Sequence, residues 1–389
     1  MCNVHEGYAT CNPAKYRGLH HGDVVVPVAE VRCERYLCKL HTQINPCVSK
    51  SLTKSQPPPS VTYCLRGWGL CGSLYVDSDN PISALDKEQV VARLVESYGY
   101  SPFFAEKLVG VLGEEALSAA EASEKPLRKA IRVNTLKTTH RELVQRLGGK
   151  GFQLSRIPWL RNGYWVQAEP DTPPLGATHE YLFGYYFVQS PPSMYAVEAL
   201  DPRPGETVLD LAAGAGGKAT YISQLMENRG VLVAVEPKRG KVAALRSNVS
   251  RMGCTNTVIL QMDGRSLPSL GMVFDRVLLD APCTSSGVVS RHPALKLRVS
   301  AKDVAEQQNL QVALLEAAYR ALKVGGVLVY STCSYFREEG EEVVGRLVDR
   351  GASLTPLGSP GETVSKKWVR FYPHMHGTEG FFVCRVTKN

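Results

Sequence analysis

Residues 206–218 read ETVLDLAAGAGGK, an apolar run that ends in an aspartate and a glycine-rich turn. The run predicts a buried strand. The small residues after it let the backbone pass close to a bound ligand, with N–H groups of a following helix pointing at that ligand. The turn is not a Walker loop, because no serine or threonine follows Lys218, and it is not a strict G-x-G-x-x-G. It predicts a ligand-binding loop at the end of a strand.

On both sides of this loop, strands and helices alternate from Pro202 onward. Strands are predicted at residues 206–213, 230–236, 256–263, 274–282 and 326–333, and helices at 216–227, 238–253, 301–323 and 337–351. This alternation predicts an α/β fold with a parallel, doubly wound sheet and helices on both faces. The strands are short and nearly all apolar, as is typical of strands buried on both sides. Residues 201–389 are therefore predicted to form one Rossmann-like domain.

Two acidic residues follow the next two strands. Glu236 ends the second strand, where a carboxylate accepts hydrogen bonds from ribose hydroxyls, and Asp263 follows the third, where it can meet an adenine amino group. These residues suit a nucleoside-bearing cofactor that needs no phosphate-binding loop. The sequence therefore favours S-adenosylmethionine over NAD or ATP.

Two cysteines occupy the predicted carboxyl ends of buried strands, Cys283 in LLDAPCTSSG and Cys333 in LVYSTCSYFREE. Ligands of α/β sheets bind in the crevice at the carboxyl ends of the strands, so both thiols are candidates for chemistry. The alternative is inert packing, which is common for free cysteine. Carbon 5 of a pyrimidine is a poor nucleophile until a group adds at carbon 6, and a thiolate can do this. The pair therefore indicates covalent catalysis on a pyrimidine.

The surroundings of these thiols must favour the thiolate, because a free cysteine has a pKa of about 8.5. We expect electropositive neighbours, or the positive end of the helix predicted from Arg337, to supply this effect. Asp280, if protonated, can donate to N3 of the base and stabilise the adduct. Its alternative role is a strand-end carboxylate that orients a loop.

Residues 81–200 are predicted to form a separate helical and α+β domain. Helices are expected at 85–99 and 102–122, broken at Gly113, and at 139–151; strands are expected at 131–136, 152–157, 164–167 and 181–189. Basic residues are interleaved with aromatic ones, which indicates stacking and phosphate contacts with RNA; a solvated basic face over an aromatic core is the alternative. These residues are Arg128, Lys129, Arg132, Lys137, Arg141, Arg146, Tyr185, Tyr186 and Phe187.

Residues 1–80 show neither helical nor strand periodicity, and KSQPPPS at 54–60 is typical of a linker, so we expect a poorly ordered leader. Seven of the eleven cysteines precede residue 72. They lack C-x2-C zinc spacing, and no metal site is expected.

No apolar run approaches the roughly 18 residues of a membrane span, and there is no secretory signal, so an intracellular, cytoplasmic protein is expected. The net charge of +8 is compatible with a polyanionic partner.

From about Ile131 to the C-terminus, the chain resembles the Nop/Sun-type RNA (cytosine-5) methyltransferases. Seven collinear stretches carry the resemblance: RVNTLK (132–137), GYYFVQSPPSM (184–194), AAGAGGK (212–218), MDGR (262–265), DAPCTSSG (280–287), YSTCS (330–334) and RFYPHMHGTEGFF (370–382). There are departures. Gly214 and Ala215 replace a usual alanine and proline, Glu236 replaces a commoner aspartate, and the loop after Cys283 lacks a usual glycine.

The resemblance implies a class I S-adenosylmethionine-dependent methyltransferase preceded by a smaller α+β RNA-binding domain. It implies methyl transfer to carbon 5 of a cytosine in structured tRNA or rRNA, in the cytoplasm or, in a eukaryote, the nucleolus. Cys333 would attack carbon 6 and Cys283 would assist product release; a nucleophile in the TC block indicates RNA rather than DNA. Cofactor contacts would fall on Ala212, Ala213, Gly214, Ala215, Gly216, Gly217, Lys218, Glu236, Asp263 and Asp280.

Two other functions stay open from the sequence. A methyltransferase acting on another base position, such as an exocyclic amino group, would be expected to carry an aromatic residue where this chain has Cys283. A non-catalytic RNA-binding ribosome assembly factor would bind RNA without transferring a methyl group. No obligatory protein partner is evident from the sequence.

Overall fold

The computed structural model describes residues 4–5, 8–9, 60–65, 70–75, 86–358 and 367–389, and the chain divides into two units, Met1–Ala84 and Leu85–Asn389. The described parts of the first unit are two antiparallel strand pairs, β1 (Val4–His5) with β2 (Tyr8–Ala9) and β3 (Ser60–Leu65) with β4 (Leu70–Tyr75). The sequence did not predict these strands. The rest of the predicted leader, with its linker and most of its cysteines, lies outside the described residues.

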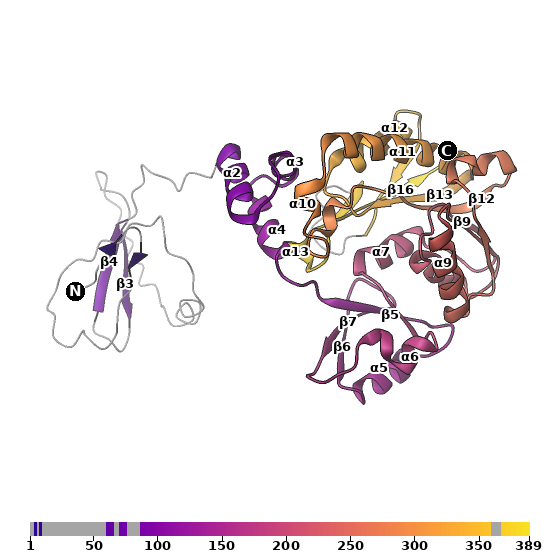
Figure 1. The fold of residues 1–389 in the computed structure, drawn as a ribbon, viewed down its shortest axis with the longest axis horizontal. Helices are drawn as coiled ribbons and strands as arrows, with labels where there is room; N and C mark the ends of the chain where they lie inside the picture. The colour runs from indigo at the N-terminus through magenta and orange to yellow at the C-terminus, as the bar shows by residue number, and fades with distance from the viewer. Residues whose placement is uncertain (1–3, 6–7, 10–59, 66–69, 76–85, 359–366) are drawn as a thin grey trace, which may run out of the picture. The chain divides into compact units, whose positions relative to one another are not determined.

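A mixed sheet forms the centre of the second unit, in the order β11-β10-β9-β12-β13-β16-β14, with β15 paired to β16 (Figure 1). Its strands are β9 (Thr207–Asp210), β10 (Val231–Val235), β11 (Thr257–Leu260), β12 (Phe274–Asp280), β13 (Leu322–Thr332), β14 (Ser353–Thr355), β15 (Trp368–Phe371) and β16 (Phe381–Thr387). Strands β9 to β13 pair in parallel, so the doubly wound fold is confirmed. The expectation of an entirely parallel sheet is wrong, because β16 runs antiparallel to β13, β14 and β15.

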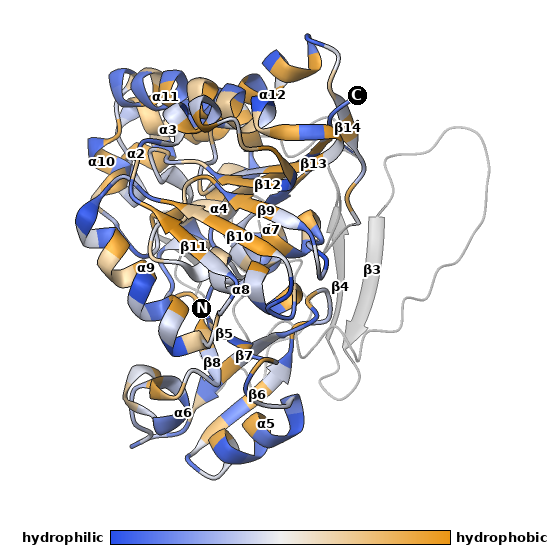
Figure 2. Cartoon of the chain, turned by 90° about the vertical axis from the view of Figure 1, so that its right-hand side faces the viewer, coloured by the Kyte–Doolittle hydropathy of each residue, from blue (hydrophilic) through white to orange (hydrophobic). Residues whose placement is uncertain are grey.

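Helices cover both faces of this sheet (Figures 1 and 2). One face packs against α7 (Pro191–Leu200), α8 (Gly217–Leu225) and α9 (Arg239–Met252), and the other against α11 (Ala301–Arg320) and α12 (Glu341–Val348). Successive residues of β9 serve opposite cores, Val208 with Ile222 and Leu245, and Leu209 with Leu314. Burial on both faces explains why these strands read as continuous apolar runs.

Several predicted bounds differ from the structure, including those of the helix predicted from Arg337 and of the aromatic run 181–189. The helix predicted from Arg337 begins as α12 at Glu341, after a 3-10 turn over Arg337–Glu339. The aromatic run 181–189 is not one strand but α6 (His179–Leu182) followed by β8 (Tyr186–Val188). Aromatic residues favour strands, but the Thr178 side chain accepts a hydrogen bond from the Tyr181 N–H and caps a helical turn.

The α+β element precedes this domain as predicted. It is an antiparallel sheet of order β6-β7-β5-β8, with α5 (His140–Gly148) packed on it. Its other strands are β5 (Lys129–Val133), β6 (Phe152–Arg156) and β7 (Gly163–Ala168). Ile131, Val133, Leu143 and Leu147 form its small core, each fully buried.

Arg132 joins this element to the larger domain. The sequence placed it among surface basic residues, but its side chain is fully buried. Its guanidinium donates to the Gln189 side chain at 2.5 Å, to the Gly217 carbonyl oxygen at 2.7 Å and to Thr220 Oγ1 at 2.9 Å. Because Gly217 and Thr220 belong to the first turn of α8, strand β5 is tied to the helix that follows the glycine-rich loop.

Three helices, α2 (Lys87–Tyr98), α3 (Pro102–Leu112) and α4 (Glu115–Ser123), precede the α+β element. Gly113 separates α3 from α4, as predicted. They form their core with Tyr335, Phe336 and Tyr372 of the larger domain, beside the short helices α10 (Leu295–Arg298) and α13 (Pro373–His376). The Phe104 and Phe336 ring centroids are 5.2 Å apart. This packing therefore supports the segment that directly follows Cys333. Among the described residues, no helix combines the length and hydropathy needed to cross a bilayer.

Replacing Phe104, which is fully buried, with alanine should lower the free energy of unfolding by about 3–5 kcal/mol, because a large cavity opens against Phe336. Phe183 is 59% exposed, and the same deletion there, Phe183→Ala, is the matched control and should cost less than about 1 kcal/mol. Urea unfolding of both variants measures the difference. Equal losses would contradict the role assigned to the Phe104 core.

Candidate active site

The predicted site residues come together at the carboxyl edge of the parallel strands. The glycine-rich loop follows β9, Glu236 follows β10, Asp263 follows β11, and the two cysteines follow β12 and β13. Parallel strands end at a common edge, and this edge includes the point between β9 and β12 where the strand order reverses. In the register of β12 with β13, Asp280 lies beside Ser331. The structure therefore assembles one site from five loops.

The Cys283 and Cys333 sulfur atoms lie 3.2 Å apart, in hydrogen-bond contact. The Ser285 hydroxyl oxygen is 3.5 Å from the Cys333 sulfur. Close packing of the neighbouring backbones fixes this arrangement: the Gly287 N–H donates to the Cys333 carbonyl oxygen at 2.9 Å. A side chain at Gly287 would place its Cβ 2.1 Å from the Gly380 carbonyl oxygen, so only glycine fits there.

The two thiols differ in acidity. The hydrogen bond that Cys283 donates to Cys333, together with burial, raises the pKa of Cys283 well above its usual value. The same bond lowers the pKa of Cys333; burial opposes this, while Ser285 and the charge of Lys218 support it. Cys333 is therefore the more acidic thiol of the pair. Of the two effects expected from the sequence, electropositive neighbours and a helix starting at Arg337, the charge of Lys218 belongs to the first.

Lys218 is nearly buried and reaches Asp280 rather than a phosphate. Its ammonium donates to one Asp280 carboxylate oxygen at 2.5 Å, and the Ser331 hydroxyl donates to the other at 2.7 Å. In this arrangement Asp280 accepts hydrogen bonds from both partners. Its predicted action as a proton donor to N3 stays a prediction.

The Glu236 carboxylate connects the glycine-rich loop to the residues that follow β10. One oxygen of this buried side chain accepts from the Gly214 N–H at 3.1 Å and the other from the Lys238 N–H at 2.8 Å. Gly214 has φ +57° and Gly216 has φ +89°, both in the left-handed region that glycine favours. A Cβ at Gly216 would lie 2.7 Å from Leu245 Cδ1, whereas one at Gly214 would meet only the Ala212 carbonyl oxygen, at 4.0 Å. The space beside Gly214 is open.

Sequence reasoning missed Asp210, the last residue of β9. Its side chain is buried, and neither carboxylate oxygen has a hydrogen-bond partner among the described residues. Burial raises its pKa to about 7, although the nearby charge of Lys218 acts in the opposite direction. A buried carboxylate without partners is costly and indicates a missing donor. Its position immediately before the loop was the available signal.

Asp263 lies on the loop after β11 and is partly exposed. Its carboxylate caps the following 3-10 turn by accepting from the Arg265 N–H at 2.9 Å, and it pairs with the Arg265 guanidinium at 2.6 Å. The hydrogen bond from Arg265 lowers its pKa. The side chain is thus held at the rim of the site, and its contact with a cofactor stays a prediction.

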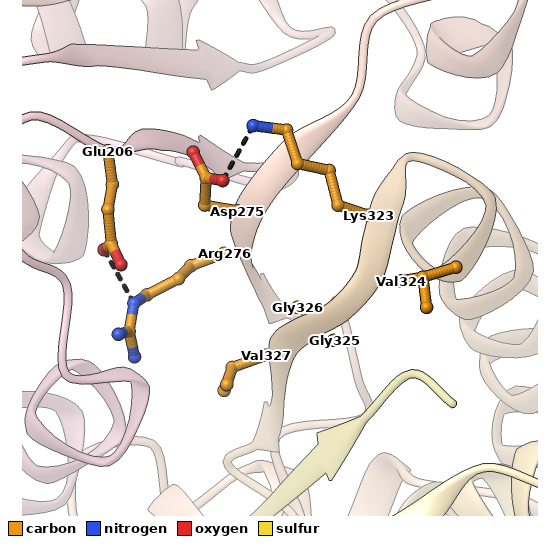
Figure 3. Close-up of a pocket in the computed structure, with 8 residues that line it drawn as sticks. All are labelled: Glu206, Asp275, Arg276, Lys323, Val324, Gly325, Gly326 and Val327. Carbon is orange, nitrogen blue, oxygen red and sulfur yellow. Dashed lines mark hydrogen bonds and ion pairs between the residues drawn. The ribbon is translucent and has the colours of Figure 1, made fainter.

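A cavity of about 250 Å³ lies away from these loops, where β9 and β12 begin (Figure 3). Its wall contains two ion pairs, Glu206 with Arg276 and Asp275 with Lys323, each at 2.7 Å. These charges are paired with each other and none belongs to the carboxyl edge. Among the described residues, no cluster of three or more acidic, histidine or cysteine side chains is arranged to hold a metal ion.

Comparisons with known proteins identify close family relatives. A family model described as 16S rRNA methyltransferase RsmB/F matches residues 197–387, and one described as the N-terminal domain of 16S rRNA methyltransferase RsmF matches residues 101–191. A 28S rRNA (cytosine-C(5))-methyltransferase of Mus musculus is 39% identical over 76% of this chain and 40% of its own length. Ribosomal RNA small subunit methyltransferase F of Vibrio cholerae is 40% identical over 69% of this chain and 59% of its own length. The chain thus spans about half the length of these curated relatives.

Two solved structures are also similar to this chain in sequence and in fold. A methyltransferase homolog protein from Pyrococcus horikoshii is 39% identical, with a TM-score of 0.70 over 80% of this chain and 100% of that one. The crystal structure of NSun6 from Pyrococcus horikoshii with SFG is 28% identical, with a TM-score of 0.67 over 73% of this chain and 97% of that one.

Iodoacetamide should alkylate Cys333 before Cys283 and at lower pH than it alkylates a free cysteine, because the thiolate reacts and the pKa of Cys333 is lowered. Peptide mass spectrometry between about pH 6 and pH 10 measures both rates. Ser285→Ala removes a hydrogen bond to Cys333 and should move its midpoint upward. Cys384, fully buried in β16, is the internal control and should stay unmodified. Earlier labelling of Cys283 would contradict the assignment.

Proposed function

The chain belongs to the Nop/Sun-type RNA (cytosine-5) methyltransferase family, and we propose that it transfers a methyl group to carbon 5 of a cytosine in RNA. One observation carries this proposal: two thiols in contact, with a lowered pKa at Cys333 and a raised pKa at Cys283, beside an open glycine-rich loop. A single thiol would serve addition to the base. A second thiol within hydrogen-bond distance suits a reaction in which the adduct must also be resolved.

S-adenosylmethionine fits the residues around the loop. The unpartnered Asp210 carboxylate suits an ammonium group, the open space beside Gly214 allows close approach, and Glu236 retains acceptor capacity for ribose hydroxyls. We assign the adenine contact to Asp263 and the remaining contacts to Ala212, Ala213, Ala215, Gly216, Gly217, Lys218 and Asp280. When bound, the cofactor supplies the electrophilic methyl group. The related structure with SFG, an analogue of this cofactor, supports the assignment.

Cys333 is the proposed nucleophile. Its thiolate adds to carbon 6 of the cytosine, and the electron pair of the carbon 5–carbon 6 double bond moves toward carbon 5 and the ring, which makes carbon 5 nucleophilic. Asp280 lies at the end of the adjacent strand, held by Lys218 and Ser331. When it carries a proton, it is proposed to donate a hydrogen bond to N3 of the base, while the Lys218 ammonium stabilises the negative charge that addition of the thiolate places on the ring.

Cys283 is proposed to resolve the adduct. Once the Cys333 sulfur is bonded to carbon it carries no charge, so the main cause that raises the pKa of Cys283 is removed. Cys283 can then lose its own proton to water and accept the proton of carbon 5. The electron pair of that carbon–hydrogen bond restores the ring double bond and expels Cys333 as a thiolate.

Ribosomal RNA is the proposed substrate class, because the matched family models and the curated relatives carry rRNA in their names. The same proposal places the protein with ribosomal RNA, in the cytoplasm or in a eukaryotic nucleolus. The α+β element is proposed to engage this RNA. Phe183 is 59% exposed there, and the Arg146 guanidinium lies 5.5 Å from the Tyr185 ring, which suits base stacking and phosphate contacts.

Cys333→Ala should abolish transfer of label from S-adenosylmethionine to RNA, because it removes the proposed nucleophile. Cys283→Ala should instead trap the adduct and give a covalent protein–RNA band on a denaturing gel. Cys254→Ala is the matched control, because this buried cysteine lies outside the site and its loss should leave both assays unchanged. A Cys333→Ala protein with near-normal activity, or a Cys283→Ala protein without a covalent band, would refute the respective role.

Bisulfite sequencing of total RNA, with and without the protein, should reveal protein-dependent 5-methylcytosine in rRNA. As the control, cells that lack the protein are complemented with the Cys333→Ala variant, which should not restore 5-methylcytosine in rRNA. Methylation confined to tRNA would refute the substrate class while keeping the reaction. Tight RNA binding with no transferred label would favour a non-catalytic assembly factor.

A further inference from the structure

Beside the two thiols lies a carboxylate that the proposed mechanism does not use. Glu339 is fully buried at the end of the 3-10 turn that follows Cys333. One of its oxygens accepts from the Thr284 N–H at 2.8 Å and from Gln311 Nε2 at 3.1 Å; the other accepts from Thr284 Oγ1 and Ser334 Oγ, each at 2.6 Å. All these donors are uncharged. Burying a carboxylate without a cation is costly, so its retention here requires a reason.

The donors come from both cysteine-bearing loops. Thr284 and Ser334 are the residues that directly follow the two reacting cysteines, so one carboxylate connects the loop after β12 to the loop after β13. Gln311 of α11 completes the connection, because its amide group also donates to the Pro282 carbonyl oxygen at 2.9 Å. Glu339 therefore bridges the two loops whose sulfur atoms are in contact.

The charge of this bridge acts on Cys283. The hydrogen bond to Cys333 and burial raise the pKa of Cys283 most, and the negative charge of Glu339 adds to them. The hydrogen bond from Cys283 is the largest cause that lowers the pKa of Cys333. A fixed negative charge, held by the residue next to Cys283, favours the protonated form of Cys283.

The other ionisable groups around the thiols do not replace this effect. Lys218 and Asp280, from α8 and β12, pair with each other and shift the pKa of Cys333 in opposite directions. The Tyr330 hydroxyl of β13 donates to a backbone carbonyl of the 3-10 turn at 2.8 Å. Arg370 of β15 is engaged by Glu341, with contacts of 2.8 and 2.5 Å.

We propose that Glu339 is a positioning residue that holds the two cysteine loops in contact and, by its charge, keeps the proton on Cys283 so that Cys333 is the nucleophile. The proposal rests on the proposed function, since it explains how the two thiols are given different tasks. It assigns to Glu339 no contact with substrate or cofactor.

The test compares Glu339→Gln with Glu339→Asp in the full-length protein, by alkylation of each thiol with iodoacetamide across a range of pH. Glu339→Gln removes the charge and should lower the pH midpoint for Cys283, raising its alkylation rate at pH 8 about tenfold, which corresponds to a shift of one pKa unit. Glu339→Asp keeps the charge and should leave the midpoint of Cys283 near that of the unchanged protein. A midpoint that stays the same in Glu339→Gln, or shifts equally in both variants, would overturn the charge effect.

Glu342→Gln is the matched control, because Glu342 accepts from Gln308 and makes no hydrogen bond to either cysteine loop among the described residues. It should change neither midpoint; a shift as large as that of Glu339→Gln would refute a local effect. The alkylation assay needs neither RNA nor cofactor. If Glu339→Gln shifts the alkylation midpoint of Cys283 but the unchanged protein transfers no methyl group, only the proposed function is refuted. If the unchanged protein transfers the methyl group but Glu339→Gln leaves the alkylation midpoint unchanged, only the role of Glu339 is refuted.

Thr284→Val tests the bridging role should the glutamate variants fail to fold. It removes one hydroxyl donor to Glu339 and keeps the charge, the shape of the side chain and the backbone N–H donor. Formation of the covalent RNA adduct should slow by about tenfold while the alkylation order of the two cysteines is unchanged. An unchanged rate of adduct formation, or a reversed alkylation order, would overturn the proposal.

Discussion

The parallel pairing of β12 with β13 is the constraint on which the site depends. Its register sets Asp280 beside Ser331, so the turns that follow the two strands begin at the same level and their cysteines meet, with 3.2 Å between the sulfur atoms. Both strands are buried between helical layers, which prevents a slip of register. A shift by one residue would turn every side chain of β12 to the other face and separate the pair.

Charge at this edge is arranged around one ammonium group. Lys218 pairs with Asp280, lowers the pKa of Cys333 and opposes the rise in the pKa of Asp210. Glu339 is bound by the residues that follow both thiols, and its charge adds to the causes that raise the pKa of Cys283. The two thiols, 3.2 Å apart, thus differ in acidity, first because of the hydrogen bond between them and then because of these charges.

The parts outside the sheet are coupled to this edge through buried contacts. Arg132 connects β5 of the α+β element to the first turn of α8, directly after the glycine-rich loop. Helix α3 packs Phe104 against Phe336, three residues beyond Cys333. Because buried contacts of this kind resist displacement, RNA engaged by the α+β element would meet cofactor and nucleophile loops whose positions are already fixed.

The amino-acid sequence by itself determined the order of strands and helices, the glycine-rich loop and the two candidate cysteines, because apolar periodicity and short motifs are local properties. It did not predict the antiparallel strand β16, the helical turn at 179–182 or the burial of Arg132, since each depends on distant partners. The tertiary structure alone decided which thiol is the more acidic and brought Glu339 to Thr284, 55 residues away in the chain. Protonation and positioning follow from groups that meet only in the folded chain, which spacing along the sequence does not specify.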